Sequence, residues 1–204
     1  MALSLARGLT LYFCRHGETE ANVAKRFQGI TIDTPLTAKG REQATAIGNI
    51  LARNVSDPAH LACVTSPLHR ARVTMEIIRT TLHLPPQDYS TDARIEEINL
   101  GAWDGLTDDE ARALDPAMFE KRGHDKWNVR VPGGGENYAD VATRAESWIA
   151  SLTADTFAVS HGAFTRILRG LFAGLTGQQM SALDEPQGVV FRVRGGEVVR
   201  LDPV

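Results

Sequence analysis

A strand-like run that stops at a cation, an imidazole and a glycine constrains this chain more than any other feature. Residues 9–14 are apolar or β-prone, and Arg15-His16-Gly17 follow them at once. A strand with this ending presents the charged group and the ring at the carboxyl edge of a sheet, where open α/β folds bind their ligands. The glycine permits a backbone turn or the close approach of a ligand. The run therefore predicts a ligand site at one edge of a sheet.

Strand-like and helix-like segments alternate along the rest of the chain. Strand-like runs lie at 60–65, 89–97, 156–160, 189–193 and 198–201. Most of them are separated by segments with apolar residues at helical spacing, and this alternation is typical of an α/β fold. The run at 156–160 meets His161-Gly162, which repeats the layout found at His16.

Local signals predict where several elements begin and end. Ser66 and Pro67 predict a helix N-terminus, with the serine as cap and the proline at the first helical position. Residues 115–135 contain two prolines and three consecutive glycines, so we expect an irregular surface excursion there. Gly195-Gly196 between two strand-like runs predict a hairpin.

Composition excludes several classes of protein. The 204 residues suffice for one well-buried domain, and no apolar run approaches the roughly 20 residues of a membrane helix. A net charge of -3 gives no general attraction to nucleic acid or anionic lipid. The N-terminal residues lack the apolar core of a secretory signal, so we expect a cytoplasmic protein with neither membrane nor nucleic-acid partners.

Cys14 and Cys63 lack metal-site spacing and are expected to be buried thiols, without a metal or cofactor.

Four polar side chains fall at junctions where a strand meets the next element. His16 follows the first strand, Arg70 lies in the first turn of the helix after the second, Glu97 ends the extended segment, and His161 follows a later strand. Within one sheet these junctions converge on one edge. The other four histidines, at 60, 69, 83 and 124, lack such partners and are expected to be surface or packing residues.

The chain resembles the histidine phosphatase superfamily, in the branch that includes cofactor-dependent phosphoglycerate mutases and many small phosphatases. Segments in family order carry the resemblance across residues 9–166: Arg15-His16-Gly17-Glu18-Thr19, Asn22, Gln28-Gly29, Pro35-Leu36-Thr37, Thr65-Ser66-Pro67-Leu68-His69-Arg70-Ala71, Glu97, Gly101-Ala102-Trp103-Asp104-Gly105, Gly135-Glu136 and Ser160-His161-Gly162. The resemblance implies a single-domain, phosphoglycerate mutase-like α/β/α sandwich, with a mostly parallel central sheet and helices on both faces. It also implies that residues 1–204 form one domain with a lid-like insertion at about 106–134.

His16 is the expected nucleophile, and its neighbours suit that role. Arg15 and Arg70 offer planar, permanently charged donors that match phosphate oxygens. Nearby cations also favour the neutral imidazole, so that a ring nitrogen can attack phosphorus and form a phosphohistidine. By resemblance, a protonated His161 adds a charged hydrogen bond to a phosphoryl oxygen and completes the catalytic set together with Glu97.

Glu97 is the family-matched proton donor, and as a carboxylate it would later activate water. It stands four residues before Gly101, as the family pattern requires. Strand alternation would turn the neighbouring Glu96 to the other face. We therefore expect Glu97 and not Glu96 in the site.

The rest of the phosphate pocket is implied by the resemblance alone. The expected phosphate-binding residues are Arg15, His16, Asn22, Gln28, Gly29, Arg70, His161 and Gly162. For Asn22, a turn residue that bonds its own backbone is an equal alternative. Ser66 is expected to be a helix cap, because the strained Gly-x-Ser-x-Gly turn of Ser-His-Asp hydrolases does not surround it.

Three positions favour hydrolysis over return of the phosphoryl group to a substrate hydroxyl. Phosphoglycerate mutases of this family have Arg, Lys and Asn where this chain has Ile98, Asp108 and Ala163. The predicted activity is therefore that of a metal-independent phosphomonoesterase acting on a small phosphorylated metabolite. A cofactor-dependent phosphoglycerate mutase is the alternative, and a catalytically inactive regulatory or interaction domain is a further one.

The excursion at 106–134 carries no signature of a particular substrate, and no segment indicates an oligomeric state. Lys121 and Arg122 are expected to be solvated residues of a charged loop, with contact to an anionic substrate as the alternative. Trp103, Phe119 and Trp127 are candidates for an apolar wall near the entrance, and for Trp103 a place in the core is an equal alternative.

Overall fold

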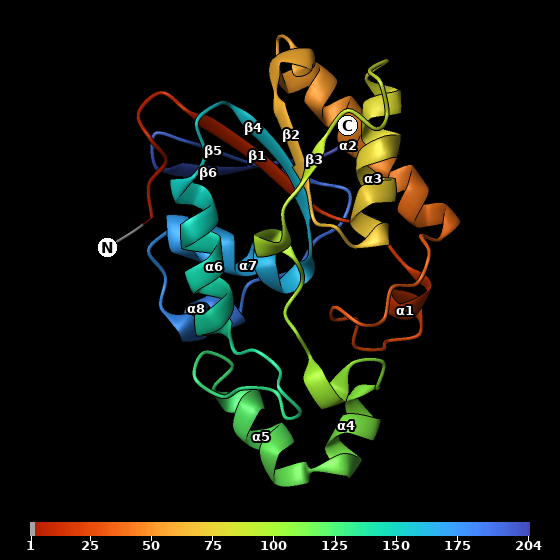
Figure 1. Ribbon diagram of the computed structural model, residues 1–204, viewed down its shortest axis with the longest axis vertical. Coiled ribbons are helices and arrows are strands. Elements are labelled where there is room, and N and C mark those ends of the chain that lie inside the picture. The colour runs from red at the N-terminus through yellow and green to blue at the C-terminus, as the bar shows by residue number, and fades with distance from the viewer. Residues whose placement is uncertain (1–2) are drawn as a thin grey trace.

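A six-stranded sheet runs through the centre of the molecule, in a computed structural model that describes residues 3–204 (Figure 1). The strands are β1 Thr10–Arg15, β2 Ala62–Thr65, β3 Ser90–Thr91, β4 Thr156–Ser160, β5 Val190–Arg194 and β6 Glu197–Leu201. Their order is β3-β2-β4-β1-β5-β6, and the first four are parallel, whereas β5 and β6 form an antiparallel hairpin at one edge. The hairpin predicted at Gly195-Gly196 is confirmed, and both glycines have the positive φ values, 58° and 85°, that such a turn requires.

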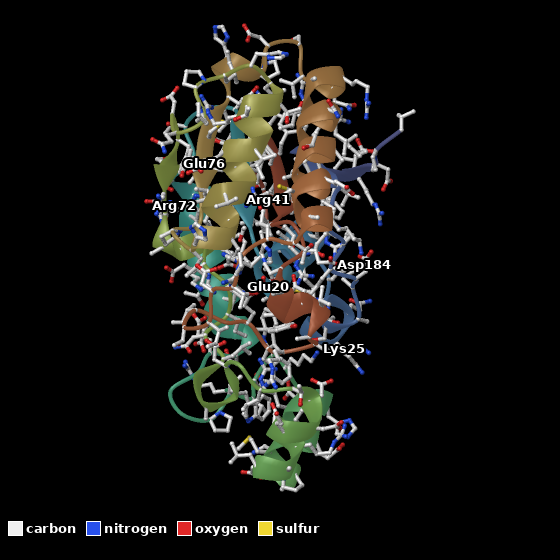
Figure 2. The ribbon with its side chains drawn as sticks, turned by 90° about the vertical axis from the view of Figure 1, so that its right-hand side faces the viewer. Glu20, Lys25, Arg41, Arg72, Glu76 and Asp184 are labelled. Carbon is white, nitrogen blue, oxygen red and sulfur yellow. The ribbon has the colours of Figure 1, made fainter. Side chains whose placement is uncertain are left out.

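Helices cover both faces of this sheet. The α-helices of the described residues are α1 Glu20–Val23, α2 Ala38–Asn54, α3 His69–Thr81, α4 Asp108–Leu114, α5 Pro116–His124, α6 Tyr138–Ala150, α7 Gly162–Phe172 and α8 Gly177–Ser181. Helices α2 and α3 lie side by side over one face, and α6 and α7 cover the other (Figures 1 and 2). The predicted α/β/α sandwich is confirmed. Within residues 3–204, no helix is both long and apolar enough to cross a bilayer.

Alternate side chains of β1 enter two separate cores. Leu11 and Phe13 pack in the core beneath α6 and α7, whereas Tyr12 and Cys14 pack in the core beneath α2 and α3. Because both faces of the strand are covered, both sets of side chains are apolar. This double burial explains why the sequence shows a continuous apolar run there instead of an alternating one.

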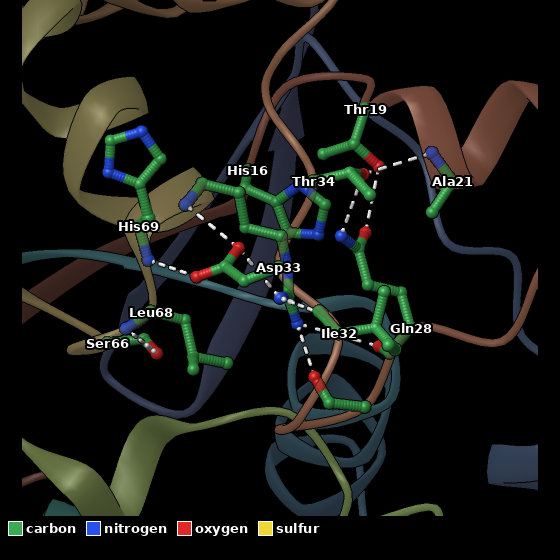
Figure 3. A network of polar contacts seen from close by, with 12 residues as sticks. His16, Thr19, Ala21, Gln28, Ile32, Asp33, Thr34, Ser66, Leu68 and His69 are labelled. Atoms are coloured by element: carbon green, nitrogen blue, oxygen red, sulfur yellow. Dashed lines mark hydrogen bonds and ion pairs between the residues drawn. The ribbon is translucent and has the colours of Figure 1, made fainter. Parts of the chain in front are cut away.

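Helix α3 begins later than the sequence indicates, and a distant carboxylate caps it. The prediction of Ser66 as N-cap is wrong, because the helix begins at His69, after Leu68. The Ser66 hydroxyl only accepts from the Leu68 N–H, at 3.3 Å. The Asp33 carboxylate accepts from the backbone N–H groups of His69 and Arg70 instead (Figure 3). A cap from so far along the chain leaves no local sequence pattern.

The excursion at 106–134 contains more helix than expected. Residues 115–135 are not irregular throughout, because α5 occupies Pro116–His124. Asp115 caps this helix by accepting from the Met118 N–H at 3.0 Å, and the proline at the first position is compatible with a helix start. Figure 1 shows α4 and α5 together at one end of the molecule, away from the body of the sandwich.

The segment 89–97 is extended only over the two residues of β3, so this predicted strand is shorter than expected. The Asp92 carboxylate accepts from the Arg94 N–H at 2.9 Å and begins a short 3-10 helix. Glu96 and Glu97 therefore lie outside the sheet. The strand-alternation argument for choosing Glu97 over Glu96 therefore does not apply. The positions of the two side chains relative to the cavity are described below.

The two cysteines are free thiols in different surroundings. Cys14 is fully buried, as expected, whereas Cys63 is only half-buried. The Arg79 guanidinium donates to the Cys63 sulfur at 3.1 Å. Burial raises the pKa of both thiols above their ordinary value, so neither is activated as a nucleophile.

Candidate active site

The register of two parallel strands brings His16 and His161 together. Arg15 at the end of β1 lies opposite Ser160 at the end of β4. The His16 N–H continues the ladder by donating to the Ser160 carbonyl at 2.9 Å. The two imidazole rings that follow these strands lie with their centroids 5.2 Å apart. The repeated His-Gly layout of the sequence is therefore one site built from adjacent strand ends.

Gly17 is required by a close approach between backbones and not by a turn. A Cβ atom at this position would lie 2.2 Å from the carbonyl oxygen of Gly40, near the start of α2. The Gly17 N–H donates to the Thr74 hydroxyl of α3 at 3.1 Å. The loop after His16 is thus held against two helices, which fixes the backbone that carries the ring.

His16 is buried with one ring nitrogen already committed. Its Nδ1 lies 2.8 Å from the Gly17 carbonyl oxygen, which can only accept a hydrogen bond. In the neutral ring this contact places the hydrogen on Nδ1 and leaves the lone pair on Nε2. Burial first, and then the charges of Arg70 and Arg15, hold the pKa of His16 well below its ordinary value. The ring is therefore neutral and nucleophilic at Nε2.

Arg70 is fully buried and anchored by the loop that precedes α2. Its Nη1 donates to the Asp33 carboxylate at 3.1 Å and to the Ile32 carbonyl at 3.2 Å, and its Nη2 donates to the Gly29 carbonyl at 2.8 Å. Figure 3 shows Asp33 joined to the start of α3 in the same network. The Arg70 Nε has no partner among the described residues. The guanidinium is thus oriented by the protein and keeps one donor free.

Glu97 lies on the cavity wall, whereas Glu96 does not. One carboxyl oxygen of Glu97 accepts from the N–H of Ile98 at 2.9 Å and from the N–H of Ala163 at 3.1 Å. Burial, and secondarily the negative charge of Glu185, raise the pKa of Glu97 above its ordinary value. The Ala163 N–H also lies 3.4 Å from the second carboxyl oxygen. The protein thus fixes the position of a carboxyl group whose raised pKa favours the protonated form more than in water.

His161 is fully buried, and both of its ring nitrogens lack a partner within residues 3–204. Burial and the charge of Arg70 are the main causes that hold its pKa well below the ordinary value. The neutral ring is therefore favoured before a ligand binds, and the charged hydrogen bond expected of a protonated His161 stays a prediction. Buried polar atoms are rarely left without partners, so these nitrogens are available to a ligand.

A cavity of about 490 Å³ is lined by Arg15, His16 and Glu97, whereas Arg70 and His161 are not among the residues of its wall. Its wall includes five cationic side chains (Arg15, Arg26, Arg122, Lys126 and Arg166), three acidic ones (Glu97, Asp108 and Glu185) and four apolar or phenolic rings (Phe27, Trp103, Phe119 and Tyr138). Cavities of this size hold small-molecule ligands. The excess of cations suits an anionic one.

Comparison with known proteins identifies the family. The sequence profile of the histidine phosphatase superfamily (branch 1) matches residues 11–197. The chain belongs to this superfamily. The structure of YhfR from Bacillus stearothermophilus superposes with a TM-score of 0.78 at 32% identity, covering 94% of this chain and 95% of that one. A mycobacterial glucosyl-3-phosphoglycerate phosphatase superposes with a TM-score of 0.77 at 28% identity, covering 98% and 99% of the two chains.

Two curated relatives are longer than this histidine phosphatase chain. The glucosyl-3-phosphoglycerate phosphatase of Mycolicibacterium vanbaalenii is 38% identical over 136 residues, which cover 66% of this chain and 56% of that protein. Human 6-phosphofructo-2-kinase/fructose-2,6-bisphosphatase 3 is 30% identical over 187 residues, which cover 90% of this chain and 33% of that protein. The chain thus spans about half of the first relative and a third of the second.

The remaining residues expected in the histidine phosphatase pocket are only partly brought together. Asn22 and Gln28 line the cavity beside Arg15. The Gly29 N–H donates to the Asp104 carboxylate at 2.8 Å, and Gly29 is not among the residues of the cavity wall, so its contact with phosphate stays a prediction. Gly162 begins α7, and its missing side chain makes room for a carboxylate, since an added Cβ would lie 2.6 Å from Glu185 Oε2.

Several residues that support the site were missed by sequence reasoning. Asp33 and Asp104 hold the loop around Arg70, and the Asp104 carboxylate accepts from three backbone N–H groups of that loop. Gln187 donates at 3.1 Å both to the His16 carbonyl and to the Asn22 side chain. Glu185 bridges the guanidinium groups of Arg15 and Arg166. All of these contacts join residues far apart in the chain. Asp104 stood in a quoted family motif, but the motif did not show which backbone groups its carboxylate would bind.

Metal-ligating side chains do not cluster in the part of the chain that the structure describes. Residues 3–204 contain no group of three or more His, Cys, Asp or Glu side chains arranged to hold a metal ion. Turnover without a metal stays a prediction, which a chelator tests directly.

Proposed function

We propose that this chain is a phosphomonoesterase that hydrolyses small phosphorylated metabolites through a phosphohistidine at His16. The observation that carries the proposal is the placement of two buried groups on the wall of one cavity: an imidazole whose Nδ1 faces a carbonyl oxygen, and a carboxyl group whose pKa is raised. Such a pair supplies a nucleophile and a proton donor at once. Family membership supports the same chemistry.

In the first step, His16 Nε2 attacks phosphorus and the bond from phosphorus to the ester oxygen breaks. Glu97 transfers its proton to the leaving oxygen and becomes a carboxylate. Arg15 and Arg70 bind the peripheral phosphoryl oxygens, because their planar, permanently charged donors match that geometry. The products of this step are the free alcohol and a phosphohistidine.

In the second step, the Glu97 carboxylate takes a proton from a water molecule, whose oxygen attacks phosphorus. The bond between Nε2 and phosphorus breaks, and inorganic phosphate leaves. Glu97 is then protonated again and His16 is neutral, so both groups return to their starting states.

His161 acts on the charge that spreads over the phosphoryl oxygens. A bound phosphate dianion favours the protonated imidazole, since an adjacent negative charge raises the pKa of a histidine. The proton uptake therefore accompanies substrate binding. The protonated ring then donates to a phosphoryl oxygen and stabilises the transition state.

Hydrolysis is favoured over mutase activity by three residues on the cavity wall. Ile98, Asp108 and Ala163 occupy the positions at which the related mutases carry Arg, Lys and Asn, and all three line the cavity. An apolar, an acidic and a small apolar residue do not retain a phosphoglycerate as those polar residues would. Water is then the acceptor of the phosphoryl group.

The first test is hydrolysis of 4-nitrophenyl phosphate in the presence of EDTA. The second uses a ³²P-labelled ester, and the reaction is quenched without acid so that a phosphohistidine survives. We expect phosphate release that EDTA leaves unchanged, and a label that is stable in alkali, labile in acid and absent from His16→Ala. No release from any phosphomonoester contradicts the function. Release with the label on another residue contradicts the mechanism, and interconversion of phosphoglycerates far above their hydrolysis establishes the mutase.

A further inference from the structure

The far end of the cavity, named here the lid end, is formed by Phe119, Arg122, Lys126, Tyr138 and Arg166. The mechanism proposed above uses none of these residues. Three of them are cations, and they come from α5, from the segment after it and from α7. The cation cluster, formed by Arg122, Lys126 and Arg166, thus lies on the cavity wall outside the residues assigned to phosphoryl transfer.

Arg122 is a buried cation without a counter-ion. Only 5% of the residue is exposed, and no acidic side chain within residues 3–204 lies within ion-pairing distance of it. Its Nε has no hydrogen-bond partner among the described residues. The guanidinium carbon lies 5.9 Å from the Trp103 ring and 5.8 Å from the Tyr138 ring. The rings compensate only part of the lost hydration, because burying an unpaired charge is costly.

Lys126 is a second cation of the lid end that is affected by the positive charges of Arg122 and Arg166. It lines the cavity and has no acidic partner within ion-pairing distance in the described chain. Burial and the charges of Arg166 and Arg122 lower its pKa. The backbone carbonyl of Lys126 accepts from the Tyr138 N–H at 2.9 Å, which ties this segment to the start of α6. Lys126, Arg122 and Arg166 thus line one cavity, and the negative charges of Glu185 and Asp108 offset the effect of the two guanidinium groups on Lys126 only in part.

Arg166 connects the lid end with the phosphate-binding residues. Its Nη2 lies 3.1 Å from one Glu185 oxygen, and Arg15 Nη1 lies 3.6 Å from the other. Its Nη1 donates to the Tyr138 hydroxyl at 2.8 Å, and its Nε has no partner among the described residues. One carboxylate thus separates the cation of the phosphate site from the cation cluster of the lid end. A ligand that reaches both must be longer than a phosphate group.

We propose that Arg122, Lys126 and Arg166 bind a second anionic group of the substrate, either a carboxylate or a second phosphate. This proposal rests on the phosphatase function, because the first anion is the phosphoryl group that His16 attacks. An anion between the three cations supplies the missing counter-charge and accepts from their free donors. The substrate class is accordingly a phosphomonoester with a second anion on a short carbon skeleton, long enough to pass the Glu185 carboxylate.

The test compares matched pairs of esters. Glycerol 3-phosphate and 3-phosphoglycerate differ by a carboxylate, and glucose 1-phosphate and glucose 1,6-bisphosphate differ by a phosphate. We expect kcat/KM to be about tenfold or more higher for the two-anion member of at least one pair, as charge-assisted hydrogen bonds imply. The pair that shows the difference identifies the second anion. Ratios near one in both pairs overturn the proposal.

Two variants assign the effect to the cluster. Arg122→Gln and Lys126→Gln are expected to lower the ratio within the pair by about tenfold. Lys121→Gln, which removes an exposed charge on the helix that carries Arg122, is expected to keep the wild-type ratio. Thermal unfolding shows that each variant folds, and Lys126→Gln removes only a half-buried side chain. Unchanged ratios in both cluster variants contradict the assignment.

The phosphatase function and the second-anion site are separated by two measurements. Hydrolysis of 4-nitrophenyl phosphate, which lacks a second anion, tests the phosphatase alone. Calorimetric titration of His16→Ala with the same pairs measures binding without turnover. Tighter binding of the two-anion esters supports the site even if no ester is hydrolysed, and equal binding within both pairs overturns it.

Discussion

The two ends of the cavity are built on different principles. The end of the cavity lined by Arg15 and His16, where we propose that the phosphoryl group binds, is named here the phosphate end. Arg15, His16 and His161 lie at or just beyond adjacent strand ends there, and the pairing of the parallel strands fixes their spacing. At the lid end, the three cations come from α5, from the segment after it and from α7, and Arg122 lies over two aromatic rings with no counter-ion among the described residues. Backbone pairing positions the groups at one end, which we propose react with phosphorus, whereas the other end carries the positive charge that we propose a second anion compensates.

This difference separates catalytic power from substrate choice. Groups that react with phosphorus must be placed accurately, because misplacement raises the barrier for every substrate. Groups that bind the rest of the substrate only need to offer charge and surface in the right region. A change at the phosphate end should therefore affect all phosphomonoesters alike, and a change at the lid end should affect some more than others.

The largest effect is expected from His16→Ala, which removes the nucleophile. We expect kcat for every ester to fall by about a thousandfold or more, because no covalent intermediate forms. Phosphate release from 4-nitrophenyl phosphate and from one alkyl phosphate measures it. His60→Ala is the control, since that side chain is 84% exposed. A variant that kept its rate on one ester would contradict a shared nucleophile.

The next effect is expected from Glu97→Gln, which keeps the size of the side chain and removes its proton transfer. We expect kcat for an alkyl phosphate to fall by about a hundredfold to ten-thousandfold. The first step with 4-nitrophenyl phosphate should suffer less, because nitrophenolate leaves without protonation. Burst kinetics on both esters measure it. The neighbouring variant Glu96→Gln should keep the wild-type kcat. An equal loss of kcat in Glu96→Gln would contradict the assignment of Glu97 as the proton donor.

A smaller effect is expected at Asp33, which supports the phosphate end from outside the cavity. Asp33→Ala removes the cap of α3 and the ion pair with Arg70, so we expect a loss of about 1 kcal/mol in the free energy of unfolding together with a raised KM. Urea unfolding and steady-state kinetics measure both. Asp33→Asn retains an acceptor for the helix and should recover most of the stability but not the KM. Equal stability of Asp33→Ala and wild type would count against the distant cap.

The smallest effect is expected at Glu185, which lies on the boundary between the two ends. Its negative charge is the second cause, after burial, of the raised pKa of Glu97. In Glu185→Gln that contribution is lost, so the Glu97 pKa falls and the protonated acid is lost at a lower pH. The high-pH limb of the kcat/KM profile should therefore move to lower pH. Glu146→Gln, an exposed carboxylate of α6, should leave the limb in place, and a shift to higher pH would contradict the sign.

The sequence predicted the phosphate end far better than the lid end. His16, Glu97 and His161 were found because each follows a short strand-like or extended segment, and family motifs preserve that local order. Arg122 was assigned to a solvated loop, although it is buried, because a charged segment carries no sign of which residue turns inward. Lys126 and Arg166 were missed since neither lies at a strand end.

The sequence by itself determined the alternating strands and helices, the edge at which the chemistry-bearing residues gather, and the family. These follow from local periodicity and short motifs, which depend on neighbouring residues. Only the tertiary structure decided the tautomer of His16, the capping of α3 by Asp33 and the three cations of the lid end. Each of these depends on contacts, burial and charge contributed by residues distant in the chain, and such contacts exist only once the chain has folded.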